Sequence, residues 1–416
     1  MILSFLTLLP KTDLPPLRCD RGHHLSNRIE EGTNGVVRAE GGDAHGGTGS
    51  GGGGGGGGRI AILFDPSAQS PMPQPSVVFS TYRGDGGYGD SGIGSLFFTN
   101  NAFLNPVWLP HSGVVFIPDF NAWAVDTLTK TDGWLTFPIV PRMQLTVTNT
   151  MTVRGSRARL SIIDGAIACG NMIVTNGASL YLGSYSTTNL QTIACGGDLV
   201  ISNNGILGVY ATTTNAARTN CGALVEVGGD LVIGNGAQLV PYAHYVNGGA
   251  PLLRMQNLRI DSGGKINADT FGFSGSSASY TAGYGPGKGG ARGDNNSGGG
   301  GGYGGVGGAG ASGGGGQTYG SSNAPIYPGS GGGTGYGGGG AGGGLVRIEA
   351  RDIVTVNGTI TANGGVGSSQ KGAGSGGGIY IRCWQFIGST SGMLQANGGD
   401  GGGSGGPPAT PVITKQ

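Results

Sequence analysis

The middle of the chain, from about residue 143 to 268, repeats one short pattern of apolar residues. Four units begin with a strand-like triplet whose first and third residues are apolar, at Met172, Leu199, Leu231 and Leu258, so that successive starts are 27, 32 and 27 residues apart. A second apolar residue follows eight positions after each start, at Leu180, Leu207, Leu239 and Ile266. Apolar residues that alternate with polar ones at period two predict short β-strands in every unit.

A turn rich in Asn and Gly separates the two apolar positions of each unit. The four turns are Asn176-Gly177, Asn203-Asn204-Gly205, Asn235-Gly236 and Ser262-Gly263-Gly264. Glycine and asparagine adopt positive φ more readily than other residues do. We therefore expect two strands joined by a tight turn in each unit.

Two all-β architectures have short strands with such turns. A β-sandwich has strands spaced by roughly 8–12 residues but lacks a longer repeated unit. A parallel β-helix has one coil per roughly 20–30 residues, and equivalent positions stack on the next coil. Because the whole unit repeats, the sequence predicts a parallel β-helix, which we expect to be right-handed.

A second pattern joins such strands to glycine runs, and residues 341–365 show it most clearly. A glycine run ends there, two apolar strands follow, and residues 357–365 read N-G-x-Φ-x-A-x-G-G, where Φ is apolar. Related segments occupy residues 34–42, 262–269 and 391–399. We expect five side chains of this junction to face inward and to be buried, namely Val346, Ile348, Val354, Val356 and Ile360.

Glycine is the compositional anomaly, with 95 of the 416 residues, about three times average usage. The longest glycine-rich stretch, 276–344, could be a flexible linker. Alternatively, its runs could pack side by side as extended polyproline-II-like chains, which only residues without side chains allow. Because the strands resume after it and Tyr303, Tyr319, Tyr327 and Tyr336 punctuate it, we expect at least a partly ordered layer on the β-helix.

These patterns divide the chain into seven parts. They are an N-terminal segment (1–30) expected to be disordered, a glycine-rich β repeat ending a preceding repeat (31–100), an aromatic- and proline-rich connection packed on the solenoid (101–142), the β-helix coils (143–275), a glycine-rich insertion (276–344), a second glycine-rich β repeat (345–406) and a linker-like tail (407–416). The tail and the early first repeat suggest a segment of a longer array. For the Trp and Phe residues of 101–142, buried core is favoured over a carbohydrate-binding platform.

Charge restricts the possible partners. The chain has 23 Lys and Arg against 22 Asp and Glu, and a net charge of +1, which disfavours nucleic-acid binding because that needs a basic face. No apolar stretch is long enough to span a bilayer. Residues 1–9 are apolar, but a basic region and an A-x-A cleavage site are missing, so an export signal is doubtful.

Few residues point to chemistry. Cys169 and Cys195 follow the same Ile-Ala dipeptide 26 residues apart, and we expect them to stack as small buried hydrophobes. Cys221 follows Cys195 by the same 26 residues, but the Ile-Ala dipeptide does not precede it, so its place in the stack is less certain. Cys19 precedes His23 and His24 at a spacing that a metal could use, but no second ligand pair completes that site, so a chance cluster is favoured.

Acidic residues are sparse along the expected coils. Asp198 and Asp230 recur after a glycine at the start of a strand, where turn capping is favoured over a calcium ladder. The Arg-Gly-Asp tripeptide at 292–294 is interpreted as a chance match. We therefore assign no catalytic, cofactor-binding or metal-binding residue from the sequence.

Four strings, GAGSGGGIYIR, NGTITANGG, GGGGGGGGRIAI and GYGPGKGG, resemble repeats of large glycine-rich, adhesin-like bacterial surface proteins with β-helical repeats. The similarity covers roughly residues 31–100 and 262–406. It implies secretion or cell-surface display and a structural or adhesive role, with glycans, cell-surface components or copies of the chain as partners. The expectation is thus a non-enzymatic extracellular module. The alternatives are a carbohydrate-active β-helix enzyme of the lyase or hydrolase type and a self-assembling fibre or surface-layer subunit.

Overall fold

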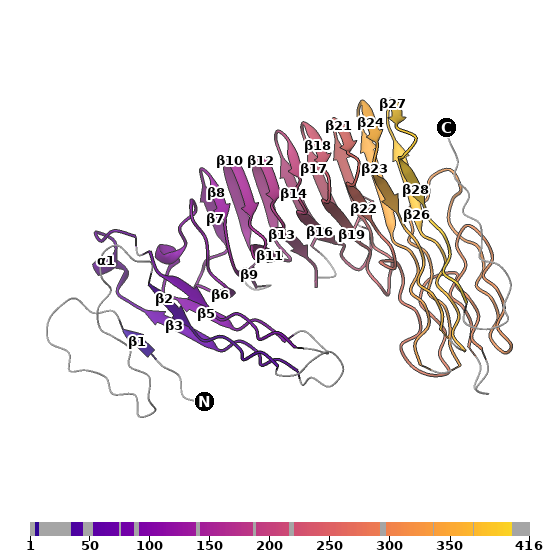
Figure 1. Cartoon of the computed structure of the whole chain (residues 1–416), viewed down its shortest axis with the longest axis horizontal. Helices are drawn as coiled ribbons and strands as arrows, with labels where there is room; N and C mark the ends of the chain where they lie inside the picture. The colour runs from indigo at the N-terminus through magenta and orange to yellow at the C-terminus, as the bar shows by residue number, and fades with distance from the viewer. Residues whose placement is uncertain are drawn as a thin grey trace.

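Two long, entirely parallel β-sheets curl around a common axis, and the chain is a parallel β-helix (Figure 1). The computed structural model describes residues 5–7, 35–44, 53–74, 76–86, 91–138, 142–185, 189–215, 220–291, 297–335, 337–368 and 370–401. Within these residues, one sheet has 12 strands, another has 14, and β2 (Val36–Arg38) pairs separately with β4 (Val78–Ser80). The prediction of a parallel β-helix is confirmed.

The 12-stranded sheet forms one face of the helix. Its strands, in spatial order, are β1 (Phe5–Thr7), β3 (Arg59–Leu63), β5 (Ser95–Phe98), β6 (Gly113–Phe116), β9 (Trp134–Phe137), β11 (Arg159–Ile163), β13 (Ser179–Gly183), β16 (Ile206–Tyr210), β19 (Gln238–Tyr242), β22 (Lys265–Asn267), β25 (Thr359–Thr361) and β28 (Met393–Gln395).

The 14-stranded sheet supplies the rest of each coil. Its main path is β26 (Gly378–Arg382), β23 (Leu345–Ala350), β20 (Pro251–Met255), β17 (Ala223–Val227), β14 (Gln191–Cys195), β12 (Ala166–Thr175), β15 (Leu199–Ile201), β18 (Asp230–Ile233), β21 (Asn257–Ile260), β24 (Ile353–Val356) and β27 (Gln385–Gly388). The long β10 (Gln144–Arg154) pairs with β12, β7 (Ala122–Val125) and β8 (Leu128–Lys130). Two short helices, α1 (Pro66–Gln69) and η1 (Asn101–Phe103), lie near the N-terminal end.

One coil comprises two strands of the 14-stranded sheet and one of the other, for example β14, β15 and β16. The predicted turns separate the second strand from the third. Asn176 and Asn203 have φ of 57° and 47°, and Gly236 and Gly263 have φ of 71° and 79°. The turn chemistry inferred from the sequence is therefore confirmed.

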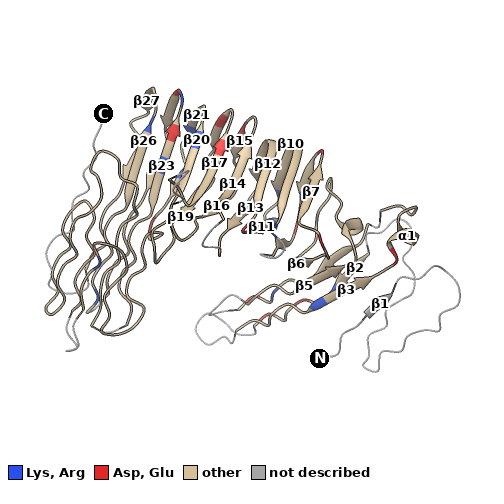
Figure 2. Cartoon of the chain, turned by 180° about the vertical axis from the view of Figure 1, so that it is seen from behind, with Lys and Arg blue, Asp and Glu red and all other residues tan. Residues whose placement is uncertain are grey.

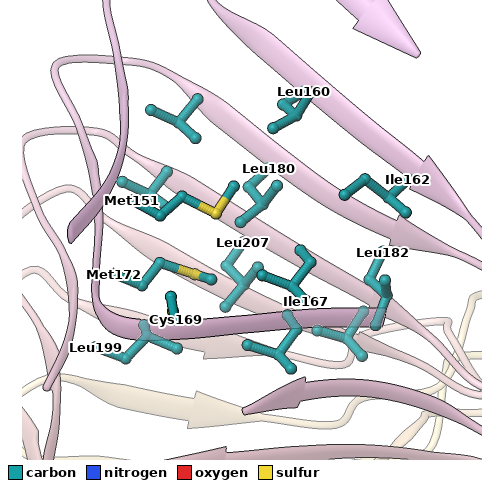
Figure 3. Packing of buried hydrophobic residues seen from close by; sticks show 14 of the residues in the cluster. Met151, Leu160, Ile162, Ile167, Cys169, Met172, Leu180, Leu182, Leu199 and Leu207 are labelled. Carbon is teal, nitrogen blue, oxygen red and sulfur yellow. The ribbon is translucent and has the colours of Figure 1, made fainter. Parts of the chain in front are cut away.

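The apolar repeat corresponds to the strand register. Met172 pairs with Leu199, Leu199 with Leu231 and Leu231 with Leu258. The second row runs through Leu180, Leu207, Leu239, Ile266 and Ile360. All of these residues belong to one continuous buried core, and Figure 3 shows Met172, Leu199, Leu180 and Leu207 pointing into it. Branched side chains that stack on like residues in successive coils fill the interior without large gaps.

The strands beside the glycine insertion have the predicted orientation. Val346, Ile348, Val354 and Ile360 have no exposed surface, and Val356 is 2% exposed. They stack directly on the preceding coils, as the pairing of Ile348 with Leu253 and of Val354 with Leu258 shows. The expected burial of all five junction residues is confirmed.

The aromatic- and proline-rich segment 101–142 contributes strands to the coils, because β6 and β9 belong to the 12-stranded sheet and β7 and β8 pair with β10. Phe103, Trp123 and Phe137 are buried, and the Trp123 and Phe137 rings lie 6.1 Å apart. These three rings belong to the core, as expected, whereas Phe116 is 42% exposed and Trp134 is half-buried.

The glycine-rich segments leave the coils at defined corners. The longest connects β22 to β23, and a second connects β25 to β26. Figure 1 shows them as a group of long chains at the C-terminal end, while the N-terminal glycine segments project from the same side of the coil stack. The β-helix therefore holds two separate glycine-rich projections.

Replacing an inward leucine tests the coil stack. Leu231 is fully buried between Leu199 and Leu258, so Leu231→Ala is expected to lower the free energy of unfolding by about 2–5 kcal/mol. The neighbouring outward residue gives the control, because Val232→Ala removes methyl groups from the same strand without opening the core. Equal losses in calorimetric unfolding of the two variants would contradict the assigned orientation.

Candidate functional site

The C-terminal projection is a bundle of extended glycine chains linked by backbone hydrogen bonds. Residues 298–302 lie at its centre, and the direction of their bonds rotates along the chain. Gly299 and Gly302 donate to carbonyls of segment 287–290, Gly298 and Gly301 donate to segment 370–373, and Gly300 donates to Gly308. Residues three apart therefore donate to the same neighbouring segment. This periodicity matches the polyproline-II conformation, which has three residues per turn.

Each chain in such a bundle can bond to more than two neighbours. The carbonyl of Gly299 accepts a bond from the N–H of Gly333, and that of Gly300 accepts one from Gly316. With the three segments that accept from 298–302, five surrounding segments therefore contact this one chain. A β-strand is limited to two neighbours in its sheet, so this arrangement is a polyglycine-II-like bundle, which is the second of the two alternatives that the glycine runs left open.

Only glycine fits the inner positions of this bundle. A Cβ atom built on Gly299 would lie 2.0 Å from the carbonyl oxygen of Gly314, and one on Gly372 would lie 1.9 Å from that of Gly299. Both distances are far below van der Waals contact with rigid backbone. Gly314 differs, because a Cβ there would have no atom within 4 Å.

Tyrosines pack among the glycine chains. The ring of Tyr319 lies 4.8 Å from that of Tyr303 and 6.2 Å from that of Tyr327. Ser330 donates to the Tyr319 hydroxyl at 2.9 Å. Burial raises the pKa of Tyr303 and of Tyr319. These side chains supply the bundle with the apolar contacts that glycine lacks.

Asparagine and aspartate side chains tie the bundle to the coils. Asp269 Oδ1 accepts the backbone N–H of Asn363 at 2.7 Å, and Asn363 Oδ1 accepts that of Asn397 at 2.8 Å. All three follow an alanine at the end of a strand in the 12-stranded sheet. The Ala-Asp pair at 268–269 and the A-N-G-G strings at 362–365 and 396–399 thus mark the points where successive coils leave for the bundle.

The N-terminal projection uses the same packing on a smaller scale. It consists of segments 39–44, 53–58, 81–86 and 91–94, and Gly41 donates to Tyr82, Gly55 to Gly42 and Gly84 to Gly55. A Cβ on Gly41 would lie 1.9 Å from the carbonyl oxygen of Gly55. Glycine is again required by the closeness of the chains.

A ladder of aromatic and arginine side chains follows the outer face of the 12-stranded sheet. The guanidinium of Arg159 lies 3.9 Å from the Trp134 ring and 4.3 Å from the Tyr181 ring. Tyr181, Tyr210 and Tyr242 continue the row, and Phe271 ends it, with its ring 4.3 Å from that of Tyr242. This ladder was not predicted from the sequence, although the Leu-x-x-Tyr strings at 207–210 and 239–242 mark its middle.

The rings of the ladder partly cover one another, although Tyr210 is still 36% exposed. Tyr210 and Tyr242 are stacked 3.9 Å apart at an angle of 3°. Gly208 leaves the space for Tyr181, since a Cβ there would lie 2.4 Å from Tyr181 Cδ1. Burial lowers the pKa of Arg159 and raises that of Tyr242. With ring faces occupied, the ladder stabilises the sheet by cation–π and stacking contacts.

An open hollow of about 640 Å³ lies where the coils meet the C-terminal bundle. Its lining includes Asn247, Phe273, Tyr284, Pro286 and Lys288. Phe273 is buried, whereas Tyr284 is 38% exposed. An aromatic surface beside an amide and an ammonium group can contact a polar organic ligand such as a sugar.

The recurring aspartates form a ladder at a corner of the coils. Asp198 Oδ1 accepts the N–H of Asp230 at 2.8 Å, and Asp230 Oδ1 accepts the side-chain amide of Asn257 at 2.7 Å. Asn171 Oδ1 accepts the N–H of Asp198 at 2.9 Å. In these bonds both carboxylates link to the next coil rather than within their own turn, which differs from the turn capping that the sequence suggested.

Two titratable side chains, His111 and Lys130, are buried inside the N-terminal coils. His111 Nδ1 accepts the N–H of Phe79 at 3.2 Å, and its Nε2 lies 2.8 Å from the carbonyl oxygen of Phe103. The Lys130 amine donates to the carbonyls of His111 and Asp132. Burial lowers the pKa of His111 to about 4 and that of Lys130 to about 7. Both side chains bond to backbone inside the coil, which is a structural role.

Several residues considered in the sequence lie outside the described part of the chain. They are Cys19, His23, His24, the Arg-Gly-Asp tripeptide at 292–294 and Tyr336, together with the tail 407–416 and, apart from β1, the N-terminal segment 1–30. In the part that is described, no three His, Cys, Asp or Glu residues come together as a metal site. Its helices are all too short or too polar to cross a membrane.

Charged side chains are scattered thinly along the coils, and most of the ribbon in Figure 2 is uncharged. Comparison of the chain with protein-family models, with curated proteins and with solved structures yields no match.

The bundle can be tested by adding one methyl group. Gly299→Ala places a Cβ against the Gly314 carbonyl, and we expect a loss of about 1–3 kcal/mol in the free energy of unfolding, as for an overpacked core. Gly314→Ala is the matched control in open space, with an effect below about 1 kcal/mol. If calorimetry finds the two variants equally stable, the bundle is not packed as described.

Proposed function

We propose that this chain is a non-enzymatic, extracellular structural or adhesive module. The β-helix acts as a stiff rod, and the two glycine bundles are its displayed parts. The observation that carries the proposal is the rotating hydrogen-bond pattern of residues 298–302. Glycine loses more conformational entropy on ordering than any other residue, so chains ordered in this way act as a rigid surface rather than as a linker.

The surface of the bundle suits weak contacts repeated over a large area. Backbone amides and carbonyls at its outer positions can donate and accept hydrogen bonds, and few formal charges lie nearby. Tyr284 and Lys288 border the hollow at its base. These features favour neutral or acidic glycans of a cell surface as partners, because hydroxyl and carboxylate groups match such donors and acceptors.

A glycan array tests this function. The wild-type chain is expected to bind at least one class of immobilised polysaccharide, and Gly299→Ala is expected to weaken that binding about tenfold, equivalent to roughly 1.4 kcal/mol. Gly314→Ala should bind like the wild type. Binding that survives in both variants would exclude the bundle as the adhesive surface. Release of shortened or unsaturated oligosaccharides from soluble polysaccharide would instead indicate the carbohydrate-active enzyme.

Self-assembly is a second candidate, and the last described coil favours it. Trp384 is 88% exposed, Phe386 is 47% exposed and Met393 is 42% exposed. Among the described strands, β26, β27 and β28 each pair on one side. Unpaired strand edges with apolar side chains are templates for another chain. Filaments that appear with rising concentration in electron micrographs would support this candidate, and a strictly monomeric preparation would oppose it.

A further inference from the structure

Two cysteines lie in contact inside the coil stack. Cys169 on β12 pairs in register with Cys195 on β14, and their sulfur atoms are 3.2 Å apart. The side chains are buried, with 8% and 3% of the residue surface exposed. Figure 3 shows Cys169 among the inward residues, close to Met172. The predicted stacking of this pair is therefore confirmed, and Cys221 is also buried but precedes β17 outside the stack.

The neighbouring coils show what this position otherwise holds. Val147 pairs with Cys169 on one side, and Val227 pairs with Cys195 on the other. Both valines are buried. The two middle coils thus replace a valine row by two adjoining thiols. Valine fills this position equally well in the neighbouring coils, so packing alone does not require cysteine. The two thiols can be oxidised, which valine cannot.

The geometry suits a covalent bond. Adjacent strands lie about 4.8 Å apart, which is within the Cα separation of about 4.4–6.8 Å that disulfides adopt. The shared register points both Cβ atoms toward the same side of the sheet. The hydrogen bond with Cys195 lowers the pKa of Cys169, whereas the same bond and burial raise that of Cys195. Cys169 is the more exposed of the two residues, at 8% against 3%, and is therefore the thiol that an oxidant reaches first.

We propose that Cys169 and Cys195 are an oxidation site that closes to an inter-coil disulfide in the presence of hydrogen peroxide. The Cys169 sulfur attacks one peroxide oxygen, the O–O bond breaks, and a sulfenic acid and one water form. The Cys195 sulfur then attacks the sulfenic sulfur, the S–S bond forms, and the hydroxyl leaves as a second water with the thiol proton. Two thiols are oxidised by two electrons, and one peroxide is reduced to two waters.

The bond would join two successive coils. In a solenoid each coil contacts only its neighbours, so local opening at one joint is a route to unfolding. A disulfide there restrains that joint and closes a loop of the chain between two positions 26 residues apart. It would persist in an oxidising extracellular environment and open under reducing conditions. This inference does not depend on the adhesive function.

The test uses the full chain with Cys19→Ser and Cys383→Ser, which leaves Cys169, Cys195 and Cys221. The reduced, folded protein is treated with hydrogen peroxide, denatured, alkylated and analysed by peptide mass spectrometry. We expect the peptides of Cys169 and Cys195 to be linked with the loss of two hydrogens, while Cys221 is alkylated. The melting temperature should rise by several degrees and return to its starting value with dithiothreitol.

Cys169→Val in the same background is the matched control, because valine already fills this row in the coils on either side. It should fold, form no linked peptide and show no peroxide-dependent change in melting temperature. Two outcomes would overturn the proposal. One is that Cys169 and Cys195 both remain alkylatable after peroxide treatment that fully oxidises Cys383 in the wild-type chain. The other is that Cys221 forms the disulfide instead.

Discussion

The closeness of neighbouring glycine chains is the constraint on which the two projections depend. Carbonyl oxygens occupy the space where side chains would be, as the 1.9 Å distance between Gly299 O and a Cβ on Gly372 shows. This closeness lets each chain bond to neighbours on several sides, and the many bonds offset the entropy lost by ordering glycine. Removing side chains is therefore the means by which these segments become rigid.

The coils and the bundles depend on each other. The strands β22, β25 and β28 are stacked in register. Because the glycine segments follow these strands, the segments begin side by side. The Asp269–Asn363–Asn397 row then satisfies backbone N–H groups where the chain leaves the sheet. Stacked exits place successive glycine segments next to one another without any long-range recognition between them.

Much of the coil could be predicted from the sequence, because the type and spacing of its side chains indicate which residues form strands, turns and core. The rows that begin at Met172 and Leu180, the Asn-Gly turns and the buried junction residues all follow from spacing and residue type. The partners within the bundle could not be predicted, because glycine has no side chain to indicate which segment it contacts. The ladder from Trp134 to Phe271 was missed because outward positions repeat less strictly than inward ones.

Hydrogen exchange of the glycine segments tests the central claim most directly. If residues 298–302 form the centre of a hydrogen-bonded bundle, their amides should exchange many times more slowly than those of an unstructured glycine peptide, and Gly299→Ala should speed their exchange. The coil amides of β15 and β18 should be unaffected by that substitution and serve as the internal reference. Exchange of 298–302 at the rate of a free chain, with protected coils, would show that the bundle does not exist.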